Sequence, residues 1–301
     1  MKFFDNWYFF HVSVFRLKQR ALWVLCFSVF LSGAYRASSE QNENHENVRQ
    51  LVQQVVDHQL AVDQNDHSRW MYRDIDKVPG KSTVKLIVQT SQGTVSKTIE
   101  INGQPPTSQQ RQQEEAQMEN LVDNPSALAK QRKNSAHDDE QSTSLMKMLP
   151  DAFLWTKTGE SNGEVTLHFE PNPAFHPPTY ASRVFAAMAG DMVVDPTQKI
   201  LRSLSGTLIH PVEFADGLFG KIEQGGTFRV VRSQIAPGEW QITETHVHIH
   251  GYVLIFKSID QQEDDETSNY KPSPASLTLR QAIAMLNNGS VASALGLKSE
   301  P

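Results

Sequence analysis

The sequence predicts a mainly β protein of the α+β class, organised around one antiparallel sheet. After Asp151, short runs of residues alternate between apolar and polar side chains, which is the pattern of strands buried on one face. Turn-forming pairs such as Asn162-Gly163, Asp195-Pro196 and Pro237-Gly238 separate these runs. Helical spacing is found mainly before the first strand, in one polar insertion and after the last strand. Short strands divided by turns in this way indicate an antiparallel meander.

The N-terminal segment has the pattern of an export signal. Residues 21–31 form a short apolar run that follows three basic residues, Arg16, Lys18 and Arg20. This run is shorter than the roughly 18 residues needed to cross a bilayer, and such a run after basic residues marks a signal peptide. Small residues place cleavage after Ala34 or Ala37, so we expect residues 1–37 to be removed and the body to lie in the periplasm. The apolar segment 3–15 leaves a retained membrane anchor as the alternative.

The composition of the exported body excludes several classes of protein. Cys26 is the only cysteine and lies in the signal, so disulfides, cysteine nucleophiles and thiolate metal sites are excluded. Residues 1–37 contain five of the 28 Lys and Arg residues and one of the 34 Asp and Glu residues, which leaves the body with a net charge of −10. An acidic body argues against nucleic acid as a partner.

One amphipathic helix is expected at the start of the body. Residues 38–46 are polar and are predicted to be a disordered linker, and the helix follows over residues 47–60 with Asn47 as its N-terminal cap. Its apolar stripe consists of Val48, Leu51, Val52, Val55, Val56 and Leu60. One buried face is therefore predicted for this helix.

The predicted strands begin with residues 68–75 and a hairpin formed by 84–88 and 95–101. The strands expected after Asp151 are 153–158, 165–170, 191–195, 200–209, 227–234, 240–250 and 252–260. Gly251 is interpreted as a turn between the last two strands. The acidic run 263–266 lacks the spacing of a calcium-binding EF-hand loop and is interpreted as a solvated turn.

We treat residues 47–272 as one domain that contains a polar insertion, and a C-terminal helix and tail follow this domain. The insertion, residues 104–145, is predicted to be mostly solvated and helical, with a break at Pro125. It is either a surface excursion, or a lid or an arm that docks a partner. The last helix is expected at 276–286, within a C-terminal segment 273–301 whose end frays.

The order of elements and several loose motifs resemble the LolA-like half-barrel superfamily. The motifs are Phe169-Glu170-Pro171-Asn172-Pro173, the strand pair around Asp195, Gly238-Glu239-Trp240 at a strand start, and Phe256 near the last strand. The superfamily includes outer-membrane lipoprotein carriers and the periplasmic sensors called RseB or MucB. The resemblance implies a strongly curved antiparallel sheet wrapped around one or more helices, with an apolar cavity that accepts acyl chains.

The resemblance makes large apolar residues the candidates for contact with a ligand. Candidate lining residues are Phe169, Phe185, Met188, Met192, Phe228, Trp240 and Phe256, and Phe214 and Phe219 are candidates for the rim. Aromatic and methionine side chains form adaptable pocket walls, although they also pack ordinary cores. Both interpretations of these residues stay open at this point.

The one pattern that suggests a metal is His246-Val247-His248-Ile249-His250. Alternate residues of a strand share a face, so the three imidazoles form a column about 13 Å long, in which two neighbours about 6.5 Å apart can share one ion. His246 and His248 are therefore weak candidates for metal ligands, and the alternative is a solvated polar face. The sequence contains no nucleophile elbow, zincin pair or phosphate-binding glycine loop. We therefore expect neither an enzyme nor a cofactor.

The sequence thus favours a noncatalytic cell-envelope protein that binds an acyl chain, a lipid or a lipidated partner, and that is peripheral to the membrane at most. The alternative is an interaction or sensor module whose cavity is filled by its own side chains and which binds another envelope protein. A third hypothesis, less favoured, is a metal-binding protein that uses the histidine column formed by His246, His248 and His250.

Overall fold

The structure is a computed structural model, and it describes residues 35–214, 220–253 and 257–297. The signal segment 1–34 therefore lies outside the described residues. The helices are α1 (Tyr35–Asn65), α2 (Ser108–Asp123), α3 (Pro125–Ala152), α4 (Tyr180–Phe185), α5 (Leu279–Asn287) and α6 (Ser290–Ala294). The strands are β1 (Trp70–Val78), β2 (Lys81–Gln89), β3 (Thr94–Ile101), β4 (Phe153–Ser161), β5 (Glu164–Pro171), β6 (Met188–Asp195), β7 (Ile200–Leu208), β8 (Val212–Phe214), β9 (Gly220–Ile222), β10 (Thr227–Ala236), β11 (Glu239–Val253) and β12 (Lys257–Pro272).

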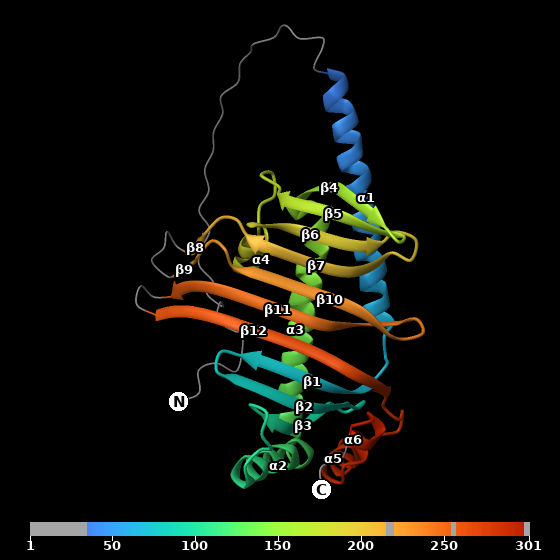
Figure 1. Cartoon of the computed structure of the whole chain (residues 1–301), viewed down its shortest axis with the longest axis vertical. Coiled ribbons are helices and arrows are strands. Elements are labelled where there is room, and N and C mark those ends of the chain that lie inside the picture. Colours follow the sequence, from blue (N-terminus) through green and yellow to red (C-terminus); the bar gives the residue numbers. More distant parts are fainter. Residues whose placement is uncertain (1–34, 215–219, 254–256, 298–301) are drawn as a thin grey trace.

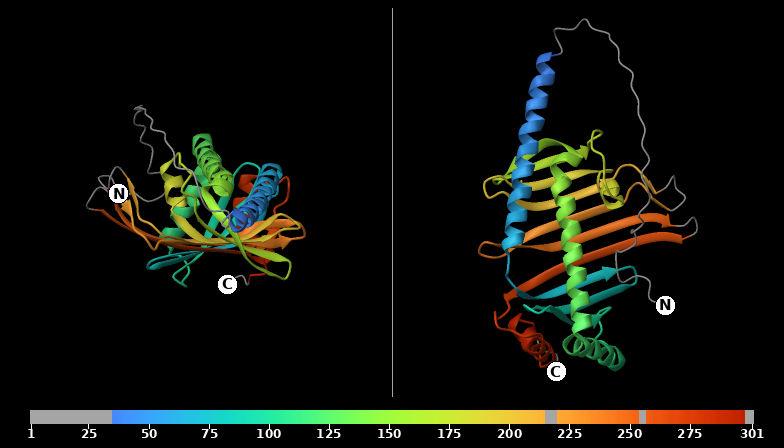
Figure 2. Two further views of the ribbon diagram at one scale, coloured as in Figure 1. Left: turned by 90° about the horizontal axis from the view of Figure 1, so that it is seen from above. Right: turned by 180° about the vertical axis from the view of Figure 1, so that it is seen from behind.

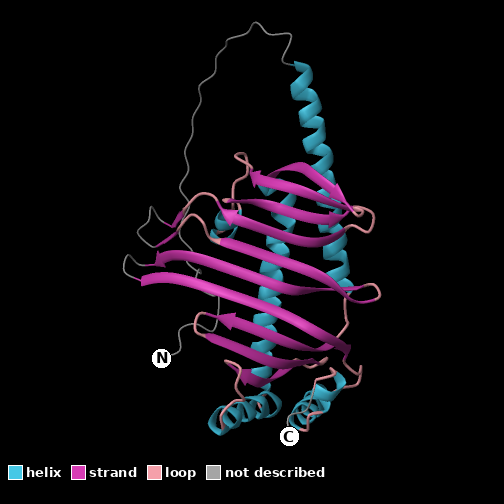
Figure 3. Ribbon diagram, viewed as in Figure 1, coloured by secondary structure: helices cyan, strands magenta, loops and turns pink. Residues whose placement is uncertain are grey.

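All these strands belong to one antiparallel sheet, which confirms the predicted fold class at this level (Figure 1). The order across the sheet is β3-β2-β1-β12-β11-β10-β7-β6-β5-β4, and the short pair β8 and β9 joins the far end of β11. Most neighbours in this order follow one another along the chain, as expected for a meander. The exceptions are the pairing of β10 with β7, between which the short strands β8 and β9 intervene in the chain, and the pairing of β1 with β12, which places the first three strands beside the last strand (Figure 3).

Helices α1 and α3 lie against one face of the sheet, which we call the α1 face (Figure 2). Directly paired residues of neighbouring strands share a face, and the registers place Phe169, Gly190, Gly206, Phe228 and Val247 in one row on the α1 face. The main core forms between this face and α1. It includes Val52, Val55, Val56, Leu149, Leu167, Phe169, Met192, Val194, Leu204 and Leu208.

A second core lies on the opposite face, which we call the α5 face, at the other end of the sheet. Helix α5 contributes Leu279, Ala282 and Leu286, and the first three strands contribute Met71, Leu86, Val88 and Val95. Helix α2 adds Met118 to the same core. The two cores thus stabilise opposite ends of the sheet from opposite sides, which leaves the central strands β11 and β12 between them.

Two opposed glycines make room for aromatic rings in the main core. Gly190 and Gly206 pair directly across β6 and β7. A Cβ atom at Gly206 would lie 2.7 Å from Cε1 of Phe228 and 3.1 Å from Cζ of Phe169. Both distances are shorter than carbon atoms pack, so the absence of a side chain leaves room for each ring to lie close to the glycine backbone.

The polar insertion forms two helices that are anchored at both ends. Asn124 ends α2 and its side chain accepts hydrogen bonds from the first amides of α3, with Pro125 at the first helical position. Leu128 packs on the second core and Leu149 is buried in the main core. The predicted break at Pro125 is therefore confirmed, but α3 continues to Ala152 and crosses the α1 face from one core to the other (Figure 2).

Helix α1 is longer than the sequence predicts. It begins at Tyr35 and ends at Asn65, so residues 38–46 are part of the helix rather than a linker, and Asn47 lies inside it rather than at a cap. The predicted stripe does face the sheet, because Val48, Val52, Val55 and Val56 are all buried in the main core.

The prediction of a turn at Gly251 is wrong, and so is the solvated turn at 263–266. Strand β11 runs through Gly251 to Val253, and β12 contains the whole acidic run. Gly251 is required for another reason: a Cβ atom there would overlap the carbonyl oxygen of Lys221 in β9. The alternation of a strand then sends the acidic side chains to opposite faces of the sheet.

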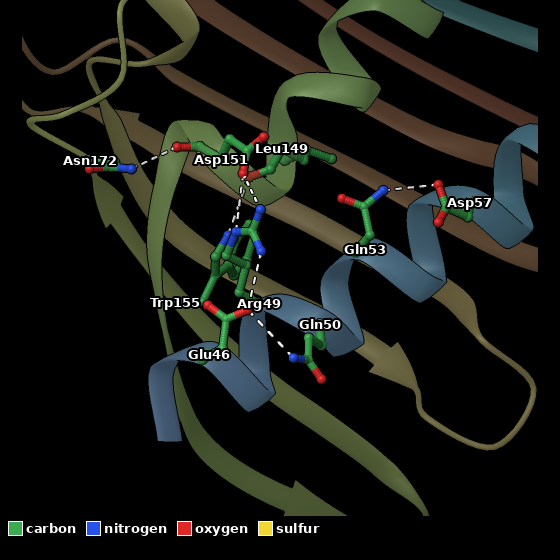
Figure 4. A network of polar contacts seen from close by, with 9 residues as sticks. All are labelled: Glu46, Arg49, Gln50, Gln53, Asp57, Leu149, Asp151, Trp155 and Asn172. Carbon is green, nitrogen blue, oxygen red and sulfur yellow. Dashed lines mark hydrogen bonds and ion pairs between the residues drawn. The ribbon is translucent and has the colours of Figure 1, made fainter. Parts of the chain in front are cut away.

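A polar network attaches α1 to the end of α3 (Figure 4). Nε and Nη2 of Arg49 lie 3.1 and 2.5 Å from Oδ1 of Asp151, and Nη1 lies 3.3 Å from Glu46. The carbonyl of Asp151 accepts a hydrogen bond from Nδ2 of Asn172 at 2.8 Å. Because these charges are well exposed, the network adds little to the free energy of unfolding, and its main effect is to orient α1 relative to the end of α3.

Candidate functional site

Five of the predicted lining residues come together on the α1 face. Phe169, Met188 and Met192 are buried in the main core, and Phe185 and Phe228 pack against it while partly exposed. The side chains of Met192 and of Val52 in α1 both have 0% exposure. The apolar part of this face is therefore filled by α1, and the five residues pack against protein.

Aromatic contacts give this region its shape. Phe153 lies at the centre, with its ring centroid 4.6 Å from that of Phe169 and 5.0 Å from that of Phe185. The neighbouring Trp155 is buried and its Nε1 donates to the carbonyl of Leu149 at 3.2 Å. The sequence predicts a strand that contains Phe153 and Trp155, but neither residue is among the candidate lining residues. Their spacing of two residues, which puts both on one face, was the available signal.

The remaining lining candidates do not join this group. Trp240 begins β11 at a separate place, where the guanidinium of Arg202 lies 4.1 Å from the centre of its ring and Arg232 donates to its carbonyl at 2.9 Å. Its ring thus takes part in a cation–π contact. Phe219 and Phe256 lie outside the described residues, as does the side chain of Phe214.

The α1 face becomes polar toward the first strands. One row of paired residues runs from Leu204 and Val230 to Thr245, Asp265 and Asp76. Asp74 lies diagonally to Asp265 on the same face and shares a hydrogen bond with it. Helix α3 crosses this part of the sheet, and its own central residues carry polar side chains such as Gln131, Asn134 and His137 (Figure 2).

These carboxyl groups form a partly buried acidic cluster, which we define as Asp74, Asp76 and Asp265. Desolvation, followed by the charge of Asp74, raises the pKa of Asp265 to about 7. Desolvation also raises the pKa of Asp74, against the opposing effect of Lys85. Oδ1 of Asp76 is buried and finds no hydrogen-bond partner among the residues that the structure describes. Asp265 therefore keeps its proton to a higher pH than an exposed aspartate does, and the two carboxyl groups titrate as a pair.

Two tyrosines border the acidic cluster. The rings of Tyr72 and Tyr270 are stacked with centroids 5.0 Å apart, and the hydroxyl of Tyr270 donates to Oγ1 of Thr267 at 2.7 Å. Burial raises the pKa of both phenols, so they stay protonated as the cluster titrates. The two phenols therefore stay neutral while the charge of the acidic cluster changes.

The histidine candidates for metal binding lie on the α5 face. Nδ1 of His246 is 2.8 Å from Oδ1 of Asp264, and the rings of His248 and His250 are 4.2 Å apart. A similar pair lies along the same row, where Nδ1 of His168 is 2.9 Å from Oδ1 of Asp191. Within residues 35–297, leaving aside the two undescribed gaps, no group of three or more His, Cys, Asp or Glu residues is arranged to hold a metal ion. The contacts of His246 and His168 are those of a polar sheet surface.

Within its described part, the chain has no helix with the length and apolar character needed to span a bilayer. Comparison of the chain with models of protein families, with curated proteins and with solved structures gave no match.

Proposed function

We propose that this chain is a noncatalytic protein of the cell envelope that acts as an interaction module, with its apolar sheet face filled by its own helix α1. One observation carries this choice between the two binding hypotheses: the predicted lining residues pack against buried valines of α1. Val52, Val55 and Val56 are at most 2% exposed. An acyl chain of any length needs that same space.

The export part of the proposal is supported by the N-terminal sequence. Basic residues and a short apolar run precede Ala34 and Ala37, the two expected cleavage points. N-terminal sequencing of the protein recovered from the periplasm tests this part. The proposal predicts a chain that begins at Tyr35 or Ser38, whereas a chain recovered from the membrane with its first residues intact contradicts it.

An acyl-chain carrier is the second candidate function, and it includes the description of the sheet as a curved half-barrel. The observation that favours it is the floor beneath α1, which contains Phe169, Met188 and Met192 rather than branched aliphatic residues alone. Removal of α1 would expose a contiguous apolar surface of the kind that binds lipid. The carrier function thus requires that α1 leave the sheet when ligand enters.

Lipid uptake distinguishes the two functions. We expect native mass spectrometry of the gently purified mature protein to show the mass of the polypeptide alone, and cis-parinaric acid to give no rise in fluorescence with the protein. The double variant Val52→Ala/Val55→Ala opens space beneath α1, so it reports whether the assay detects binding in this region. The matched control is Val62→Ala, because Val62 is on the same helix but 44% exposed. Stoichiometric lipid on the wild-type protein would establish the carrier instead.

A further inference from the structure

A hollow of about 510 Å³ opens on the α5 face, away from the filled core. It lies over β10, β11, β12 and β1, and its charged and hydroxyl-bearing lining residues include Arg73, Ser233, Thr243, Glu244, Glu266 and Ser268. The registers place Arg73 opposite Ser268, and Ile75 opposite Glu266. A volume of this size is within the range of pockets for small organic ligands.

Arg73 is the unpaired charge of this hollow. Its side chain is half-buried, and among the described residues it has no hydrogen-bond or ion-pair partner. Glu266 lies diagonally across the strand pair from Arg73, and its Oε1 forms an ion pair with Nζ of Lys77 at 3.1 Å. Glu244 lies 3.7 Å from Nε2 of His246. Each of these two carboxylates therefore has a partner other than Arg73, and the guanidinium retains its full capacity as a donor.

Hydroxyl groups line the same hollow as Arg73. Oγ of Ser233 and Oγ1 of Thr243 lie 2.8 Å apart and form a hydrogen-bonded pair at the wall, and Ser268 faces Arg73 across the strand pair. The register between β1 and β12 shifts just beyond Arg73, at the level of Asn269, whose φ of 59° is left-handed. Such bulges redirect side chains at the margin of a sheet. Ile75 supplies an apolar wall.

We propose that this hollow is a binding site for a small organic molecule that carries an oxyanion, a carboxylate or a phosphate, with Arg73 as its anchor. The planar guanidinium offers two parallel N–H donors that match either oxyanion. The hydroxyl of Ser268 and the one hydroxyl of the Ser233–Thr243 pair that does not donate within the pair supply further donors, and Ile75 contacts the body of the molecule. The volume exceeds that of a bare ion, so the oxyanion belongs to a larger ligand.

Calorimetric titration of the full mature chain with four probes tests this site. The probes are inorganic phosphate, acetate, phenyl phosphate and benzoate, the last two adding an apolar ring to each anion. We expect saturable binding that is tighter for the probe with the ring, and the preferred anion identifies the source as a phosphate or a carboxylate. The substitution Arg73→Gln should weaken binding by about 10- to 100-fold, as expected for the loss of a charge-assisted hydrogen bond.

The control is Arg229→Gln, because Arg229 projects from β10 on the same face and does not line the hollow. We expect this variant to bind as the wild type does. Equal weakening by both substitutions, or no saturable binding by the wild-type protein, overturns the proposal. If Arg73→Gln lowers the melting temperature enough to prevent the titration, Arg73→Lys takes its place. It keeps the charge but loses the two-pronged geometry, so binding unchanged in this variant also contradicts the proposal.

Discussion

At the scale of single residues, the two glycines of β6 and β7 show how the absence of a side chain shapes the core. Gly190 and Gly206 face each other, and the rings of Phe169 and Phe228 occupy the space above Gly206. A glycine within a strand ordinarily weakens it, since it adds entropy to the unfolded chain and packs nothing. Here it leaves space for two aromatic side chains that a methyl group would displace.

We predict that Gly206→Ala lowers the free energy of unfolding by about 1–3 kcal/mol, the usual cost of overpacking a core. The new methyl group would press on Phe228 and Phe169, and both rings are restrained by their neighbours. Urea denaturation measures the effect. Gly159→Ala is the control, because a Cβ atom there finds its nearest neighbour at 3.8 Å. Similar stability of the two variants would contradict this account of the glycine pair.

The acidic cluster gives a pH dependence with a definite sign. The pKa of Asp265 rises from 3.8 to about 7 on folding. Between these values the unfolded chain has lost the proton and the folded protein keeps it, so stability falls as the pH rises from about 4 to about 7. Above this window both states are ionised and the dependence ends.

We predict that Asp265→Asn flattens this slope, because the amide cannot ionise, and that it stabilises the protein most at pH 8. Urea denaturation at a series of pH values measures the slope. The control is Asp57→Asn, which changes an exposed carboxylate of α1 that bonds only Gln53 among the described residues. A wild-type stability that rises between pH 4 and pH 7 would show that Asp265 does not retain its proton.

At the scale of elements, α1 owes its position to a stripe of valines rather than to its own helical tendency. Its side chains include many polar residues, and the buried ones gather on the sheet side. Valine is a modest helix former, so packing against the sheet has to supply the stability. The helix therefore acts as the cover of the main core.

We predict that Val52→Ala lowers the free energy of unfolding by about 1–3 kcal/mol, through lost burial and the cavity that remains. Val62→Ala, on the exposed side of the same helix, should change it by less than about 0.5 kcal/mol. Thermal and urea denaturation of both variants test the comparison. An equal effect of the two substitutions would mean that α1 contributes little to the core.

Helix α3 has a different role, because its two ends are packed and its centre is not. Leu128 is near one end and Leu149 near the other, whereas most side chains of residues 129–144 are exposed. We predict that backbone amides of residues 129–144 exchange with deuterium faster than those of β6 and β7. Protection follows packing as well as hydrogen bonding, so equally slow exchange would imply that the centre of α3 is also held.

At the scale of the whole molecule, one sheet serves two cores on opposite faces. The α1 face is covered at the β4 end and the α5 face at the β3 end. The central strands carry polar side chains on both faces, with the acidic cluster on one and the row of His246 and Asp264 on the other. The polar surfaces at the centre of the sheet are therefore available for contact with a partner, whereas the apolar surfaces of the two cores are covered by the protein's own helices.

The sequence by itself determined the antiparallel meander, the amphipathic character of α1 and the break at Pro125, because each depends on local periodicity or local backbone chemistry. Only the tertiary structure decided what the apolar stripes cover. The same aromatic and methionine residues suit a ligand cavity or a protein core, and the choice depends on where α1 lies. Gly251 and the acidic run 263–266 likewise resembled turns, because close approach of β9 and the pairing of charges across strands arise between segments distant in sequence. A local sequence pattern does not indicate contacts between distant segments. The filled core, the acidic cluster and the hollow at Arg73 could therefore be identified only in the folded chain.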